Sequence, residues 1–175
     1  MTLSLDRFGG LRLAWLGAFV AVGAFASFGV SCAAPFAAFA AIAAIANPRG
    51  AALALTASAW LVNQVVGFAV LHYPSDPETL GWGGALLAVA LLGCETARLV
   101  APRAGVIAAF VASFVAYEGA LYLATVAMGG VTTHYAPESV ARLFAINAAA
   151  FAVLFAAGKL ASAIVARRAR AVVYG

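Results

Sequence analysis

Three residues with metal-binding side chains, Cys32, His72 and His134, are widely separated in a sequence that holds only two cysteines and two histidines. A thiolate and imidazole nitrogens suit soft and borderline metals such as cobalt, zinc, copper or haem iron. No two of the three stand at the spacing of a zinc or redox motif. A metal or ligand site that uses them therefore depends on a fold that carries them to the same face.

Polar side chains inside long apolar runs form a second group of candidates. Glu118 and Tyr122 are four residues apart, so they share one face of a helix. Trp60, Asn63 and Gln64 share a face in the same way. Glu118 could bind a proton, contact a ligand or pair with a buried basic residue. Asn63 and Gln64 could line a polar pocket, or simply hold neighbouring helices together by hydrogen bonds.

Other candidates stand near the ends of the apolar runs. Arg142 follows Glu138 by four residues, and it could pair with this carboxylate or meet an anionic ligand group. Glu95 and Arg98, three residues apart, are expected to form a local ion pair. Aromatic residues at the run ends could line the mouth of a pocket: Tyr73, Trp82 and Tyr135.

These residues are set in a chain of 175 residues that is 66% hydrophobic and 9% charged. A soluble domain has about a quarter charged residues, so this chain lacks the polar surface that water requires. Lipid therefore replaces water, and a single transmembrane domain over residues 1–175 is predicted. The ten basic residues lie mostly between and beyond the apolar runs. No basic stripe is present, so nucleic-acid binding is not expected.

Six apolar segments predict an all-α integral membrane bundle of six transmembrane helices. A span needs roughly 20 residues, and the second segment, which begins near Pro35 and ends before Pro48, is shorter. It could cross thinned bilayer or be partly re-entrant. The glycine-rich run around Trp82 is expected to form a flexible start of the fourth span. The predicted spans are residues 11–31, 33–46, 51–71, 81–99, 104–128 and 139–166.

Connections with arginine alternate with connections that lack lysine and arginine. Arg49 lies between the second and third segments, and Arg98 and Arg103 flank the join of the fourth and fifth. We expect a protein of the bacterial inner membrane. The positive-inside rule then places both termini on the cytoplasmic side, with His72 and His134 on the outer side. An alternative is that the first segment, which ends beside a cysteine, is a cleaved lipoprotein signal.

No enzyme motif accompanies these features. The sequence contains no phosphate-binding glycine loop, no HExxH, no Gly-x-Ser-x-Gly and no carboxylate dyad. We therefore expect no enzymatic activity and no required cofactor. A membrane enzyme that uses Glu118 or Cys32 is a minor alternative.

The plan of the chain resembles the substrate-binding S-component of energy-coupling-factor vitamin transporters. The resemblance rests on the short chain, six alanine-rich spans, cytoplasmic ends, the Ala14-xxx-Ala18 pair and the aromatic external connections. The stretch from Asn63 to Pro74, with possible cobalt ligands at the outer rim, resembles the solitary cobalamin type. The resemblance implies a small ligand, such as a corrinoid, that enters from the periplasm. It also implies a partner membrane subunit with ATPases, docked on Ala14 and Ala18.

The same resemblance implies ligand contacts from the spans and their external connections, with Cys32 or His72 as an axial cobalt ligand. The main alternative is a non-catalytic membrane subunit or assembly factor of a respiratory or photosynthetic complex, in which His72 and His134 bind haem. A fold alone does not decide between them. The implied ligand-binding residues are Trp60, Asn63, Gln64, His72, Tyr73, Trp82, Glu118, Tyr122, His134, Tyr135 and Arg142.

Overall fold

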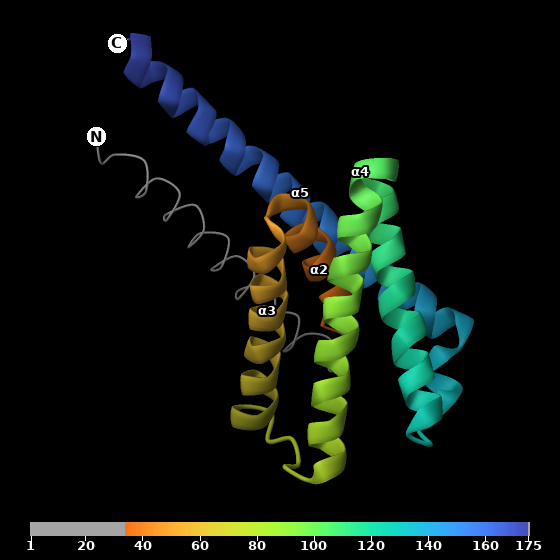
Figure 1. The fold of residues 1–175 in the computed structure, drawn as a ribbon. Helices are drawn as coiled ribbons and strands as arrows, with labels where there is room; N and C mark the ends of the chain where they lie inside the picture. Colours follow the sequence, from red (N-terminus) through yellow and green to blue (C-terminus); the bar gives the residue numbers. More distant parts are fainter. Residues whose placement is uncertain (1–33, 175) are drawn as a thin grey trace.

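The structure, a computed structural model, describes residues 34–174 of the chain (Figure 1). This part is all-α, as predicted. The first predicted span lies outside the described residues, together with Ala14, Ala18 and Cys32. The elements are α2 (Phe36–Ala46), α3 (Arg49–Ala69), α4 (Pro77–Ala127), the short 3-10 helix η1 (Thr132–Tyr135) and α5 (Pro137–Tyr174).

Three of these helices are long and apolar enough to cross a membrane: α3, α4 and α5, the last over Pro137–Ile164. Their outward faces carry large apolar side chains such as Ile107 and Leu123, each about two-thirds exposed. Water would disfavour so much exposed apolar surface, whereas lipid accepts it. The chain is therefore a multi-pass membrane protein.

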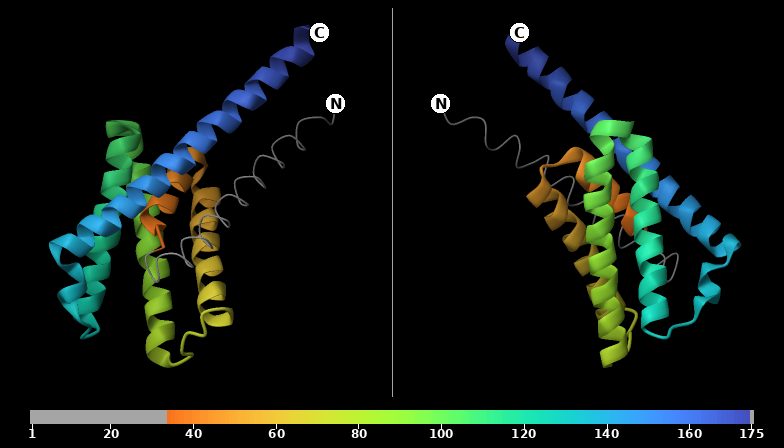
Figure 2. Two further views of the ribbon diagram at one scale, coloured as in Figure 1. Left: turned by 180° about the vertical axis from the view of Figure 1, so that it is seen from behind. Right: turned by 45° about the vertical axis from the view of Figure 1, so that its right-hand side comes forward.

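Helix α4 folds back on itself at Gly105, where φ is 83° and ψ is 177°. This conformation is available almost only to glycine. Pro102, just before the bend, cannot donate the backbone hydrogen bond of a continuing helix. Figures 1 and 2 show the two arms, residues 77–104 and 106–127, side by side. Each arm exceeds the roughly 20 residues of a span. The predicted segments 81–99 and 104–128 thus correspond to two arms joined by a bend.

The start of α4 differs from the prediction. The Asp76 carboxylate accepts a hydrogen bond from the Thr79 backbone N–H at 2.8 Å, and Pro77 follows it at the beginning of the helix. A capping aspartate followed by proline is a strong helix start. The glycine run that contains Trp82 is therefore already helical, and the prediction of a flexible start there is wrong.

Helix α2 is the centre of the bundle. Nine of its 11 residues are buried, and it consists only of phenylalanine, alanine and isoleucine. A helix that is apolar all round is typical of complete enclosure by other elements, and α2 packs against α3, α4 and α5. At 1.5 Å per residue it is roughly 16 Å long, about half the hydrocarbon thickness. The prediction of a short second segment is confirmed.

The helix connections gather at two ends of the molecule (Figures 1 and 2). The α2–α3 connection and the Gly105 bend lie at one end, and the α3–α4 and α4–η1 connections lie at the other. The first, called the arginine end, carries Arg49, Glu95, Arg98 and Arg103. The second, called the tyrosine end, carries Tyr73, Tyr122 and Tyr135.

Candidate functional site

The polar face of α3 packs against the first arm of α4. The Trp60 indole N–H donates a hydrogen bond to the Gly83 carbonyl at 2.8 Å. A Cβ atom on Gly83 would lie 3.0 Å from the Gln64 side-chain oxygen, so the glycine leaves room for Gln64. Trp60, Asn63 and Gln64 are all half-buried. The structure therefore places this predicted group between two helices, and Trp60 has a packing role there.

The α3–α4 connection folds back over the last turn of α3. The Tyr73 backbone N–H donates to the Gly67 carbonyl at 3.0 Å, and the Tyr73 ring occupies the space that a side chain on Gly67 would need. His72 has a φ of 55°, a left-handed conformation that is uncommon for a residue other than glycine. Its side chain is exposed. The connection is therefore ordered around Tyr73, and His72 points to the surroundings.

Tyr135 of η1 joins the second arm of α4 at the tyrosine end. Its hydroxyl lies 2.9 Å from the Thr125 hydroxyl, and its ring meets the Tyr122 ring edge to face with centroids 5.1 Å apart. Trp82, from the other arm, lies next to Gly130, where an added Cβ would be 3.4 Å from the indole. The structure thus brings the predicted residues Trp82, Tyr122 and Tyr135 to one end. Thr125 was missed, although a hydroxyl within an apolar run could have indicated it.

Glu118 lies one helical turn from Tyr122, inside the bundle. It is 9% exposed, and no group among the described residues hydrogen-bonds to its Oε2 atom. One turn further from the tyrosine end, the Phe114 ring contacts Phe144 of α5 with centroids 5.1 Å apart. Glu118 therefore sits in the helix stripe between two aromatic contacts, Phe114–Phe144 and Tyr122–Tyr135. No ion pair among the described residues includes Glu118, so the predicted alternative of a buried basic partner is not supported.

The electrostatics of Tyr135 connect it with Glu118. Burial raises the pKa of the Tyr135 phenol, the hydrogen bond with Thr125 lowers it, and the nearby Glu118 carboxyl raises it further. Once Glu118 has lost its proton, its negative charge disfavours a phenolate close by, which accounts for the direction of the last effect. The carboxyl and the phenol therefore interact electrostatically, although they belong to different elements.

The remaining predicted contacts lie at the surface. His134 in η1 and Arg142 in α5 are both exposed, and Arg142 forms no ion pair with Glu138 within the described part of the chain. Residues 34–164 also contain no group of three or more histidine, cysteine, aspartate or glutamate side chains that could hold a metal ion. Of the two possible axial cobalt ligands, Cys32 lies outside the described residues, and the side chain of His72 is exposed.

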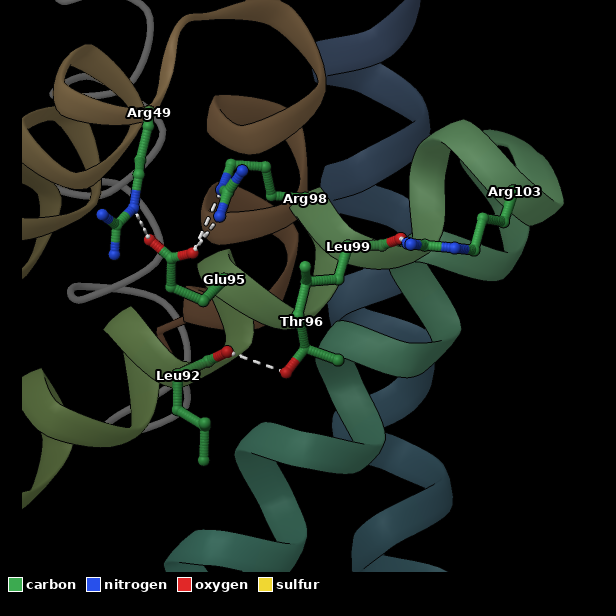
Figure 3. A network of polar contacts seen from close by, with 7 residues as sticks. All are labelled: Arg49, Leu92, Glu95, Thr96, Arg98, Leu99 and Arg103. Carbon is green, nitrogen blue, oxygen red and sulfur yellow. Dashed lines mark hydrogen bonds and ion pairs between the residues drawn. The ribbon is translucent and has the colours of Figure 1, made fainter.

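The arginine end is held together by one carboxylate (Figure 3). Glu95 accepts a hydrogen bond from Arg49 Nε at 2.8 Å, and from Arg98 Nη2 at 2.7 Å. The predicted Glu95–Arg98 pair is confirmed, and Arg49 joins it from α3. Arg103 instead donates to the Leu99 carbonyl of its own helix. Two arginines thus pair with one glutamate, and Arg103 adds a further positive charge at this end.

Comparison with known proteins gives no further guide to the role of either end: no protein-family model, no curated protein and no solved structure matches this chain.

Proposed function

We propose that this chain is a six-span inner-membrane protein that binds a small vitamin-like ligand at the tyrosine end and takes it up from the periplasmic side. The observation that carries the proposal is the buried carboxyl of Glu118. One of its oxygens has no hydrogen-bond partner among the described residues, and it lies one helical turn from the Tyr122–Tyr135 contact. An unsatisfied polar group at membrane depth costs several kcal/mol. Ionisable groups at this depth are functional candidates for that reason.

The proposed orientation follows from the charges at the two ends. Arg49, Arg98 and Arg103 lie together at the arginine end, and the connections of the tyrosine end contain no lysine or arginine. The positive-inside rule places the arginine end in the cytoplasm and the tyrosine end in the periplasm. Six spans result when the predicted first segment and the two arms of α4 are counted with α2, α3 and α5, where α2 is the short one.

The proposed ligand site uses three parts of the tyrosine end. Glu118 supplies a carboxyl, Tyr122 and Tyr135 supply aromatic walls, and Trp82 approaches from the other arm of α4. Binding sites for small molecules combine apolar and aromatic walls with few polar groups, and this arrangement fits that pattern. A corrinoid is the specific ligand that the family resemblance suggests, with His72 or Cys32 at the cobalt.

The energy source for uptake is proposed to come from a partner. The sequence holds no ATP-binding motif, so any coupling to ATP requires another subunit. A coupling subunit would dock on the small-residue pair Ala14 and Ala18 of the first span, because small residues let helices approach closely.

Uptake of cyanocobalamin tests the specific form of the proposal in a bacterial strain that lacks its own inner-membrane importer. The wild-type chain should restore cobalamin-dependent growth, and Glu118→Gln should reduce uptake about tenfold, equivalent to about 1.4 kcal/mol. Glu78→Gln is the matched control, because Glu78 is an exposed glutamate in the first turn of α4, at the tyrosine end of the molecule. Absence of growth, with no corrinoid in the purified protein, contradicts the cobalamin form. A Soret band in that protein would support the haem-binding alternative.

A further inference from the structure

We propose that Glu118 is a proton-binding site: its carboxyl is held as an uncharged carboxylic acid inside the bundle and exchanges its proton with water at the tyrosine end. This inference goes beyond ligand uptake and holds whatever the ligand is. It rests on the burial of one carboxyl, on the groups that surround it, and on the different chemistry of its two sides, which are apolar towards the arginine end and hydroxyl-lined towards the tyrosine end.

The burial of Glu118 disfavours a carboxylate. Its side chain is 9% exposed, and Oε2 has neither solvent contact nor a hydrogen-bond partner among the described residues. Moving an unpaired carboxylate into such surroundings costs far more than moving the neutral acid, so a buried carboxyl without a partner takes up a proton instead.

The charged and titratable groups around Glu118 do not compensate a negative charge. Its own helix contributes the phenols of Tyr117 and Tyr122, and η1 contributes Tyr135 and the exposed His134. Helix α2 contains no titratable residue. Within the first two turns of α5, Glu138 and Arg142 are exposed and neither pairs with Glu118 in the described part of the chain. Only phenols therefore face the carboxyl from these elements.

The surroundings also give the proton a direction. On the side of Glu118 that faces the arginine end lies the apolar Phe114–Phe144 contact. On the other side lie hydroxyl groups: Tyr135 and Thr125 at 2.9 Å from each other, and Tyr122, which is 42% exposed. Hydroxyl groups both donate and accept hydrogen bonds, so they can pass a proton. Release leaves a carboxylate and a protonated water at the tyrosine end, and the reverse step restores the acid.

A hydrophobic carbodiimide tests the proposal on the full-length protein in lipid nanodiscs. This reagent requires a protonated carboxyl in apolar surroundings. The acid proton moves to a carbodiimide nitrogen while the carboxyl oxygen bonds to the central carbon, and the adduct rearranges to a stable N-acylurea with no leaving group. Peptide mass spectrometry should find the adduct on Glu118 at neutral pH, and not on the exposed Glu78. Labelling should fall as the pH is raised and should persist in Glu118→Asp.

Two outcomes would overturn the proposal: no adduct on Glu118 in a folded protein, or an adduct whose yield does not change with pH. Infrared spectroscopy gives a second measurement, because the carbonyl band of a protonated carboxyl should be present in the wild-type protein and lost in Glu118→Gln. Persistence of the full band in that variant would also contradict it. Labelling needs no ligand, so labelled Glu118 without uptake refutes the proposed function alone, and uptake without labelling refutes the proton site alone.

Discussion

Asn147 of α5 caps the central helix α2 across 109 residues of sequence: its Oδ1 atom accepts a hydrogen bond from the Ala38 backbone N–H at 3.1 Å. The Asn147 amide nitrogen donates to the Leu143 carbonyl of its own helix at 3.0 Å. The N-cap residue of α2 is Pro35, whose side chain cannot accept a hydrogen bond. A long helix therefore supplies the cap that the short helix lacks, and it fixes α2 in the middle of the bundle.

Replacement of this cap should weaken the whole fold. Asn147→Ala leaves the Ala38 N–H buried without a partner, and we expect a loss of about 1–3 kcal/mol in the free energy of unfolding. Denaturant titration in detergent, followed by circular dichroism, measures it. Asn47→Ala is the control, since Asn47 bonds to the Ala43 carbonyl at the less buried end of α2. Equal losses in the two variants would show that the amide on α5 has no special role.

Close packing of the two arms of α4 gives a second prediction. A Cβ atom on Gly93 would lie 3.0 Å from the Ser113 hydroxyl and 3.3 Å from the Ser113 carbonyl. Shifting the backbone to make room costs free energy, so Gly93→Ala should lower the free energy of unfolding by about 1–3 kcal/mol. At Gly84, in the same arm, nothing lies within 4 Å of the added atom. Gly84→Ala should therefore be neutral or stabilise the helix by about 0.5–1 kcal/mol. Thermal unfolding separates the two, and a stable Gly93→Ala protein would contradict this packing.

The ion cluster at the arginine end should make a contribution that depends on salt. Glu95→Gln removes the charge that holds Arg49 of α3 against α4. The melting temperature should fall slightly at low salt, and the difference from wild type should shrink as salt is added, because counter-ions screen exposed charges. Arg103→Gln should have a smaller effect, because within the described part of the chain Arg103 bonds to a carbonyl of its own helix. A difference for Glu95→Gln that is independent of salt would argue against an electrostatic cause.

The raised pKa of Tyr135 predicts a loss of stability at alkaline pH. The folded protein keeps the phenol proton to a higher pH than the unfolded chain does. This stabilisation is fully present below the unfolded value of about 10, and it is lost as the pH rises from there through the folded pKa. Thermal unfolding across this range should show a decline that Tyr135→Phe makes shallower. The hydrogen bond with Thr125 lowers the pKa, so Thr125→Val should move the phenol ionisation, followed by ultraviolet absorbance, to higher pH. Identical pH profiles for wild type and Tyr135→Phe would refute this account.

The long apolar runs made the all-α fold predictable from the sequence, and the proline-bounded second segment made a short helix predictable. The bend of α4 and the position at which this helix begins were harder to predict from the sequence. The bend of α4 depends on one glycine with a positive φ, and the earlier start of α4 depends on the cap supplied by Asp76. Both are local backbone features that an average over apolar residues does not detect.

For the candidate site, the sequence predicted which residues take part but not how they are arranged. Glu118 and Tyr122 share a helix face by spacing, but the spacing does not show that Glu118 is buried while Tyr122 remains 42% exposed. The contact between Thr125 and Tyr135, and the ion pair between Arg49 and Glu95, join different elements. Such contacts depend on how helices pack, and one sequence carries no direct signal for them.

Mass spectrometry of the intact protein, released from detergent under native conditions, tests most directly whether the tyrosine end is a ligand site. The account predicts that wild-type protein retains a small molecule at a fixed ratio, that Glu118→Gln loses it, and that the exposed control Glu78→Gln keeps it. Wild-type protein with nothing bound after growth in rich medium, or a molecule retained equally by Glu118→Gln, would contradict the central claim.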